Sequence, residues 1–142
     1  MRVWRLTRPE HAPGLDGEGA RLWGGRWNSP GILMVYTASS LALAVLEVLV
    51  HLPPAMRRSG GLPAMLAVAL DVPDADISDA VVGPDDRATG DAWAQRGSLA
   101  LRVPSRVIRH EMNVLINPRH PHMGLVSVAL SEPFKLDDRL GP

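Results

Sequence analysis

Short apolar segments recur along the chain, and most of them have the length and composition of β-strands. Residues 2–6 (RVWRL) alternate between polar and apolar types, as a strand with one buried face does. Residues 32–37 (ILMVYT) are dense in β-branched and apolar types and predict a stronger strand. The same criteria predict further strands at 64–72, 99–103, 114–116 and 125–130, with a last extended piece at 134–136. The core is therefore expected to form around a sheet.

One segment has the pattern of a helix. Residues 41–52 (LALAVLEVLVHL) follow Ser39 and Ser40, either of which can cap a helix, and precede two prolines that end it. Because this segment is apolar on nearly every side, we expect the helix to be buried. A short helical turn is predicted at 91–96. Many strands and one strong helix predict a single α+β domain over residues 1–142, with a mixed or antiparallel sheet.

Between the first two predicted strands, residues 18–31 (EGARLWGGRWNSPG) fit neither a helix nor a strand. They predict a loop that is kept ordered by burial of Trp23 and Trp27. The glycine spacing matches neither G-x-x-x-x-G-K-[ST] nor G-x-G-x-x-G, which excludes a P-loop and a Rossmann turn. A glycine-rich loop that presents the Arg26 guanidinium is suited to a phosphate or a carboxylate. The alternative is an ordered loop whose tryptophans only fill the core.

Charge and cysteine content exclude several classes of function. The 15 basic and 15 acidic residues give a formal net charge of zero, which disfavours a nucleic-acid backbone or an anionic membrane as partner. The chain contains no cysteine, which excludes disulfides, thiolate nucleophiles and cysteine-ligated zinc. The N-terminal residues lack the apolar region of a signal peptide, and no apolar run is long enough to span a bilayer. We therefore expect a cytoplasmic protein.

Glu47 is the anomaly of the predicted helix, because it is the only Asp, Glu, Lys or Arg within residues 27–56. Burying a carboxylate without a partner is costly, so something must compensate its charge. Two interpretations remain open: a structural salt bridge or solvent-facing position, and a carboxylate that serves a site. His51 lies one helical turn further on, and His120 and His122 form a second pair, but neither pair has a third ligand at a recognisable spacing. We therefore expect no metal site.

Several segments together carry a resemblance to a known family. They are VWRL at 3–6, DGEGARLWGGRWNSPG at 16–31, Tyr36 followed by ASSLALAVLEVLVHL at 38–52, LRVPS at 101–105 and NVLINPRHP at 113–121. In this combination the chain resembles the RES-domain family, the toxin halves of bacterial toxin–antitoxin pairs. The family is named for an Arg, a Glu and a Ser. The sequence departs from it at Val114, where many relatives carry a tyrosine.

The resemblance implies a fold similar to that of ADP-ribosyltransferase toxins and an activity on NAD as substrate, without a metal. Carried over position by position, it implies that Arg26, Glu47 and Ser105 are catalytic and that Arg5 and Tyr36 line the pocket, with Tyr36 stacked on the nicotinamide ring. The residues implied to bind NAD are Arg5, Arg26, Trp27, Asn28, Tyr36, Glu47, Ser105 and Asn117. The implied partner is a cognate antitoxin with a helix-turn-helix domain of the Xre-like type, and neither nucleic acid nor a membrane is expected to bind directly.

These residues favour a toxin that cleaves NAD at the nicotinamide–ribose bond, as a glycohydrolase or phosphorylase, because a carboxylate such as Glu47 can stabilise the positive charge that develops on the ribose. A mono-ADP-ribosyltransferase that modifies a host protein is the alternative, although the chain lacks the E-x-E or Q-x-E pair of arginine-modifying transferases. A module that binds NAD or a partner without turnover is a further alternative. A serine hydrolase is disfavoured because Ser105 is not in a G-x-S-x-G motif. Asn113 and His120 are further candidates for support of the pocket.

Overall fold

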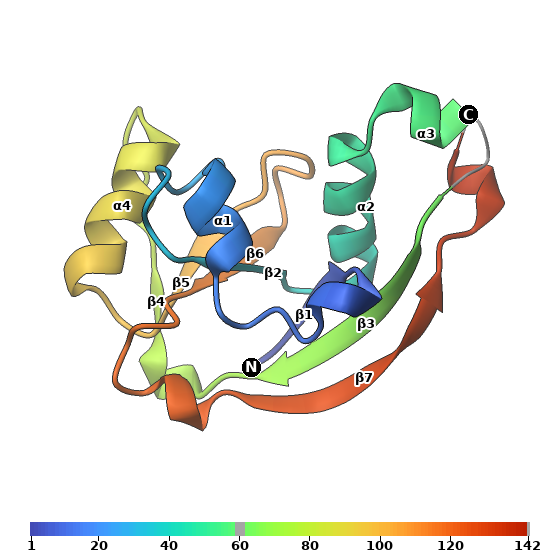
Figure 1. Cartoon of the computed structure of the whole chain (residues 1–142). Helices are drawn as coiled ribbons and strands as arrows, with labels where there is room; N and C mark the ends of the chain where they lie inside the picture. Colours follow the sequence, from blue (N-terminus) through green and yellow to red (C-terminus); the bar gives the residue numbers. More distant parts are fainter. Residues whose placement is uncertain (59–61, 142) are drawn as a thin grey trace.

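The structure is a computed structural model that describes residues 1–58 and 62–141. In this part of the chain a seven-stranded sheet carries four α-helices (Figure 1). The strands are β1 (Arg2–Thr7), β2 (Val35–Ala38), β3 (Ala64–Asp71), β4 (Ile77–Asp79), β5 (Ala100–Pro104), β6 (Met112–Ile116) and β7 (Ser127–Lys135). The helices are α1 (Glu18–Trp23), α2 (Leu41–His51), α3 (Pro54–Arg58) and α4 (Asp86–Arg96).

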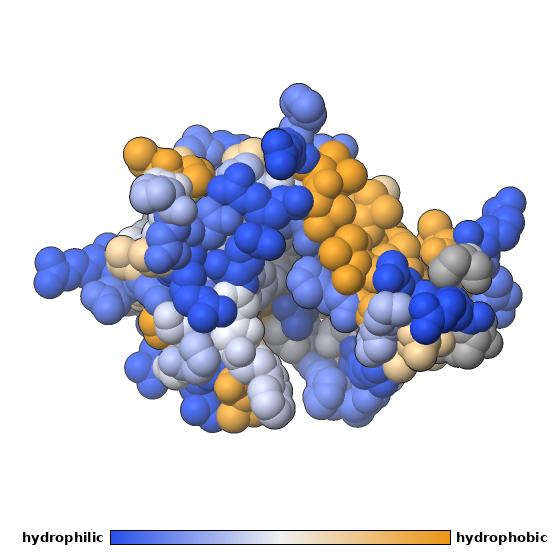
Figure 2. Space-filling view, turned by 90° about the horizontal axis from the view of Figure 1, so that it is seen from above, coloured by the Kyte–Doolittle hydropathy of each residue, from blue (hydrophilic) through white to orange (hydrophobic). Residues whose placement is uncertain are grey.

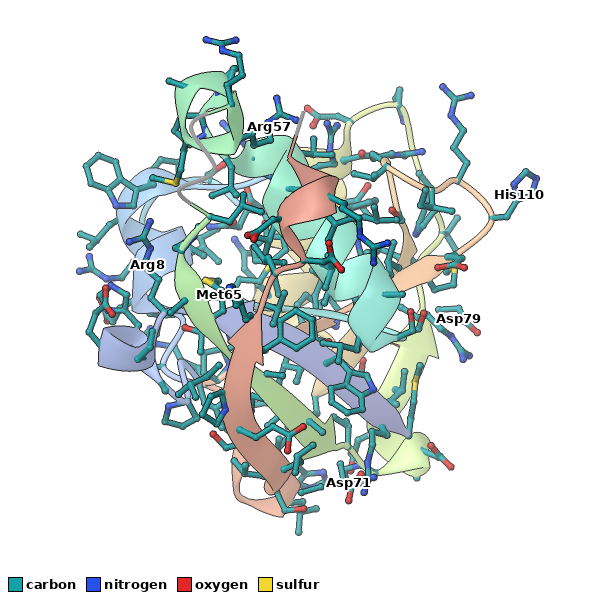
Figure 3. All side chains as sticks on the ribbon, turned by 90° about the vertical axis from the view of Figure 1, so that its right-hand side faces the viewer. Arg8, Arg57, Met65, Asp71, Asp79 and His110 are labelled. Carbon is teal, nitrogen blue, oxygen red and sulfur yellow. The ribbon has the colours of Figure 1, made fainter. Side chains whose placement is uncertain are left out.

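The domain combines one sheet with several helices, which confirms the predicted α+β class, and the sheet is mixed, one of the two predicted arrangements. Its strand order is β4-β5-β6-β2-β1-β3-β7, and only the β4–β5 pair is parallel among the registered pairs of the described strands. At one edge, β7 pairs with β3 from Ala64↔Lys135 to Asp71↔Ser127. Figure 3 shows β7 in front of β3, with Met65 and Asp71 toward opposite ends.

The sheet opens between β1 and β2. These two strands share one registered pair, Trp4↔Ala38, whereas β1 and β3 share six and β2 and β6 share four. Figure 1 shows the result: α1 and α4 stand above one part of the sheet, and α2 stands above the other. The two parts are still one body, because a single buried cluster contains Val3 of β1, Val35 of β2 and Val114 of β6.

Each helical side has its own apolar core. Leu43 and Leu49 of α2 pack with Leu6 of β1 in one cluster. On the other side, Trp27 and Trp93 pack with residues of β5 and β6. The weakly paired strands β1 and β2 lie between the helices of these two cores (Figure 1).

Most predicted strands are confirmed, and the differences have local reasons. The second strand begins at Val35 rather than at 32, because the preceding residues belong to a turn in which the Ile32 N–H donates to Ser29 O. Residues 125–130 and 134–136 are not two pieces: one strand, β7, covers most of both, and it tolerates Pro133 because it lies at the sheet edge. The short elements β4 and α3 were not predicted.

The helices differ more from the expectations. The expected turn at 91–96 is the end of a longer helix, α4, which begins after Asp85, whose side chain accepts a hydrogen bond from Ala88 N at 3.1 Å. The expectation that residues 41–52 form a helix is confirmed, with Ser40 as its cap. Complete burial of this helix was wrong, because Leu46 and Val50 are 36% and 55% exposed. No helix within the described residues combines the length and apolarity that a membrane span requires.

The predicted loop at 18–31 contains a helix in its first half, α1. Gly17 precedes it with a positive φ of 73°, a conformation that glycine adopts without strain. Two contacts from outside the helix hold it: Asn28 Nδ2 donates to Ala20 O at 2.8 Å, and Gly31 N donates to Arg21 O at 2.7 Å. Such tertiary contacts are invisible to a pattern of neighbouring residues. The loop after α1 then runs from Gly24 to Gly31.

Candidate active site

The charge of Glu47 is compensated by two neutral side chains rather than by a cation. Its Oε1 accepts a hydrogen bond from Ser105 Oγ at 2.8 Å and a second from Asn113 Nδ2 at 2.7 Å. Glu47 is partly exposed, and within residues 1–58 and 62–141 it forms no ion pair. Of the interpretations left open by the sequence, the structural salt bridge is therefore wrong for the described part of the chain, whereas a partly solvent-facing carboxylate agrees with the structure.

Ser105 directly follows β5 and is completely buried. Its Oγ accepts hydrogen bonds from Val107 N at 3.1 Å and from Ile108 N at 3.0 Å, and its own N–H donates to Glu111 O. The hydroxyl therefore closes a tight turn and directs its proton to Glu47. This arrangement suits a residue that orients a carboxylate, and among the described residues no histidine is hydrogen-bonded to the hydroxyl to activate it as a nucleophile.

Tyr36 and Asn28 hold the loop at 24–31 in place. The Tyr36 hydroxyl donates to Asn28 Oδ1 at 2.6 Å and accepts from Trp27 N at 3.0 Å. Burial raises the pKa of Tyr36 to about 12, against a smaller lowering by the Trp27 hydrogen bond. The Asn28 amide donates in turn to the carbonyls of Ala20 and Ile32. Both polar groups are therefore occupied by the loop itself, and their role in this structure is to support its shape.

The two tryptophans of this segment have opposite environments. Trp27 is 2% exposed and packs in the core, as expected. Trp23, at the end of α1, is 83% exposed, so the expectation that both tryptophans are buried was wrong. The α-carbon of Gly90 on α4 fits directly against the Trp27 backbone, which leaves no room for a side chain at that position. Close backbone packing against α4 thus fixes the loop.

Arg26 projects from this loop and is 59% exposed. Its Nη1 lies 3.7 Å from the carboxylate of Asp86, at the start of α4. The same carboxylate accepts two hydrogen bonds from Arg106, at 2.6 and 2.8 Å, and Arg106 also lies over the Trp27 ring at 5.7 Å. The hydrogen bond from Arg106 lowers the pKa of Asp86. A surface hollow is lined by Arg26, residues 83–87 and Arg106.

Arg5 lies where β1 and β2 separate. Its Nη1 donates to Tyr36 O at 3.0 Å, which satisfies a β2 carbonyl next to the single registered β1–β2 pair. Its Nε is buried and has no hydrogen-bond partner among the described residues. Burial lowers the pKa of Arg5, and the charge of Asp16 opposes this shift. Arg5 and Tyr36 are thus direct neighbours at the opening of the sheet.

The remaining sequence candidates have local partners. Asn117 is buried, donates to Ala94 O at 3.0 Å and accepts from Arg119 N at 2.9 Å, so it connects the end of β6 to α4. His51 Nδ1 bonds to Glu47 O at 2.7 Å, and His122 Nδ1 contacts Asp76. Among residues 1–58 and 62–141, no three His, Asp or Glu side chains gather as metal ligands do.

One face of the molecule is hollowed between its two helical sides (Figure 2). Figure 2, seen from above, shows a depression between the two sides of the molecule, with hydrophilic residues on the α1 and α4 side and apolar residues over α2. Glu47 approaches from α2, whereas Arg26 and Ser105 come from the other side. Both donors to Glu47 bind Oε1, and Oε2 has no hydrogen-bond partner among the described residues. A fixed carboxylate with one free oxygen can stabilise positive charge, and exposed guanidinium groups can bind phosphates.

Comparison with known proteins gives consistent results. A family model described as the RES domain matches residues 2–137. The chain is 41% identical over 138 residues to a Sphingobium protein named "Prs ADP-ribosylating toxin", with 83% of each chain covered. It is 36% identical to a "Toxin Res" from Photorhabdus laumondii, with 83% of this chain and 82% of that protein covered. A "Toxin Res" from Pseudomonas putida is 32% identical, with 99% of each chain covered.

A solved structure has a similar fold. The crystal structure of the M. tuberculosis MbcT-MbcA toxin–antitoxin complex contains a chain that matches with a TM-score of 0.68 and 21% identity. The match covers 98% of this chain and 85% of that chain. At this identity the likeness establishes the fold alone.

Proposed function

Because the chain belongs to the RES-domain family, we propose that it is the toxin of a toxin–antitoxin pair and that it consumes NAD by cleaving the nicotinamide–ribose bond. The name of the Sphingobium relative supports an activity of this kind, since ADP-ribosylation by NAD breaks the same bond. The observation that carries the proposal is the state of Glu47: one carboxylate oxygen is fixed by two donors, and the other has no hydrogen-bond partner among the described residues.

In the proposed reaction, the bond between the anomeric carbon of the ribose and the nicotinamide nitrogen breaks, and its electron pair leaves with nicotinamide. Positive charge then develops on the ribose, and the free oxygen of Glu47 stabilises it. A water oxygen forms the new bond to the anomeric carbon and releases one proton, so that NAD and water yield ADP-ribose, nicotinamide and a proton. Inorganic phosphate in place of water yields a phosphorylated ADP-ribose.

The arginines supply the second half of the proposed site. NAD carries a pyrophosphate, and the Arg26 guanidinium is exposed and lies beside Asp86, which orients it for a phosphate. Arg5 supports the pocket from the point where β1 and β2 separate, with an Nε that still has a proton to donate. In this proposal Tyr36, Trp27, Asn28 and Asn117 shape the pocket through the contacts that hold the loop at 24–31 and the end of β6.

Transfer of ADP-ribose to a protein is the second candidate, and the name of the Sphingobium relative favours it. The bond that breaks is the same, but a protein side chain replaces water as the acceptor. Because the chain lacks an E-x-E or Q-x-E pair, the acceptor in this case is not expected to be an arginine.

The proposed partner is a cognate antitoxin with an Xre-like helix-turn-helix domain that covers the entrance of the site, and the proposed location is the cytoplasm. The similar fold of a toxin crystallised with its antitoxin supports an antitoxin as partner. Expression of the toxin alone should arrest growth, and co-expression of the cognate antitoxin should restore it.

The test is to measure NAD loss and to identify the products by chromatography and mass spectrometry, with and without phosphate. Wild type should release nicotinamide together with ADP-ribose or its phosphate. Glu47→Gln should be slower by about a hundredfold or more, since it removes the charge that stabilises the ribose cation. Glu132→Gln, at an exposed position on β7, is the matched control and should act like wild type.

Two other outcomes decide between the candidates. If NAD is consumed only after cell extract is added, and a protein in the extract gains the mass of ADP-ribose, the transferase is correct. If wild type consumes no NAD under any of these conditions, or if Glu47→Gln turns NAD over at the wild-type rate, the proposed function is wrong.

A further inference from the structure

We infer that Asn113 is a positioning residue for Glu47, and that its amide determines which carboxylate oxygen faces the substrate. The inference rests on the proposed function, because it concerns the same carboxylate. It assigns a role to a residue outside the Arg, Glu and Ser for which the family is named.

The contact joins two elements that are far apart in the sequence. Asn113 Nδ2 donates to Glu47 Oε1 at 2.7 Å across 66 residues, from β6 to α2. On both sides the backbone of Asn113 is in register with a neighbouring strand, opposite Ala38 of β2 and Val103 of β5. A side chain in the middle of three paired strands has a fixed origin, so its amide is a rigid donor.

Two donors on one oxygen have a geometric consequence. The last torsion of a glutamate side chain has a broad, roughly two-fold energy profile, so a free carboxylate exchanges its two oxygens readily. The Ser105 hydroxyl and the Asn113 amide both bind Oε1, from different strand ends, and together they fix this torsion. Oε2 then keeps one direction, as a preorganised charge must before the reaction begins.

The other end of the same amide has no partner in the described part of the chain, which limits what the side chain contributes to stability. Asn113 Oδ1 is buried and has no hydrogen-bond partner among the described residues. The reverse orientation of the amide would place this oxygen against Glu47 Oε1, so the carboxylate fixes the orientation that leaves Oδ1 unpaired. A buried unpaired acceptor destabilises the folded state, and this cost offsets the stability that the hydrogen bond to Glu47 contributes. The net effect of the amide on stability is therefore small, and its main effect is the position of Glu47.

The first test compares kinetics with stability. In Asn113→Leu and Asn113→Ala, we expect kcat for NAD cleavage to fall by about ten- to hundredfold, with KM changed less than about threefold. The melting temperature of Asn113→Leu should change little, because the lost hydrogen bond to Glu47 is offset by removal of the unpaired Oδ1. Thr37→Val is the matched control: it removes a buried hydroxyl from the neighbouring strand, where Thr37 donates to Val114 O at 2.7 Å. This control should lower the melting temperature and leave kcat unchanged.

A second measurement needs no turnover. In a two-dimensional NMR spectrum of the nitrogen-labelled protein, Glu47→Gln should shift the side-chain amide signals of Asn113, because a charged acceptor becomes neutral. The side-chain signals of Asn28, whose amide donates to backbone carbonyls, should not move.

The outcomes separate this inference from the proposed function. If wild type consumes NAD but Asn113→Leu keeps the wild-type kcat, or loses activity only in proportion to a lower melting temperature, the positioning role is wrong. Unshifted Asn113 signals in Glu47→Gln would also overturn it. If the signals shift but wild type consumes no NAD, the contact is real and the proposed function is at fault.

Discussion

The Ser105 hydroxyl donates to Glu47 Oε1 at 2.8 Å, although 58 residues separate the two positions in the chain. Glu47 lies on the helix that covers one part of the sheet, and Ser105 lies at the end of a strand in the other part. The bond therefore bridges the region where β1 and β2 separate. Several properties of the protein should depend on this bridge and on the loop that faces it.

Ser105→Ala should damage the turn as well as the site. It leaves the Val107 and Ile108 N–H groups without their acceptor, and buried unpaired donors of this kind cost about 1–3 kcal/mol of the free energy of unfolding. Chemical denaturation checks this value.

The Ser105 hydroxyl donates its hydrogen bond to Glu47 and should not act as a nucleophile. A fluorophosphonate probe should therefore not label wild type. Covalent labelling of Ser105 would show that it acts as a nucleophile.

Tyr36 should make the protein sensitive to alkali. Its pKa is raised to about 12 in the folded state from a value of 10.0, so the folded state holds its proton more tightly than the unfolded state does. The contribution of this group to the free energy of unfolding is complete below pH 10 and is lost as the pH rises toward 12. It amounts to on the order of 2 kcal/mol in all. Tyr36 is the only tyrosine, so the ultraviolet absorbance of tyrosinate reports its titration directly. A midpoint near 10 would contradict this prediction.

Tyr36→Phe removes the phenol that titrates, so the free energy of unfolding should no longer fall between pH 10 and pH 12 through ionisation of this side chain. The variant should be less stable than wild type at neutral pH, because Trp27 N and Asn28 Oδ1 both lose their partner. Urea denaturation at several pH values compares the two proteins.

Asp86→Asn should weaken NAD binding more than it weakens the fold. The Asp86 carboxylate accepts two hydrogen bonds from Arg106 and lies near the Arg26 guanidinium. It therefore orients Arg26, which we propose binds the pyrophosphate. We expect KM for NAD to rise on the order of tenfold. The control is Asp79→Asn on β4 (Asp79 is labelled in Figure 3), which breaks a similar pair of hydrogen bonds from Arg102 on β5 and should leave NAD kinetics unchanged. A lower KM in Asp86→Asn would mean that this carboxylate competes with the phosphates instead.

Gly90→Ala should disturb the loop from behind. A Cβ at Gly90 would overlap the Trp27 carbonyl oxygen, so α4 and the loop would have to move apart, at a cost of about 1–3 kcal/mol. Thermal unfolding measures the loss. Gly19→Ala is the matched control in α1: its Cβ would meet no heavy atom within 4 Å, and it should stabilise the protein by up to about 1 kcal/mol. Equal melting temperatures for the two variants would argue against the packing role of Gly90.

Part of the site could be predicted from residue types alone. Glu47 is a single carboxylate in an otherwise apolar helix, and this contrast is visible in the amino-acid sequence itself. Ser105 and Tyr36 have no such contrast, and only the resemblance to a family indicated them. Asp86 and Arg106 were missed, because paired charges at the surface are common and their spacing carries no signal.

The sequence by itself determined what depends on neighbours in the chain: most of the strands, the capped helix at α2, the α+β class, and the need to compensate Glu47. Tertiary structure alone decided how that need is met, because Ser105 and Asn113 reach Glu47 only once β5 and β6 have paired and α2 has packed on the sheet. It also made a helix of a glycine-rich segment and left Trp23 in solvent while Trp27 is buried. Local preferences act between residues a few positions apart, whereas hydrogen bonds across 58 and 66 residues depend on the whole fold.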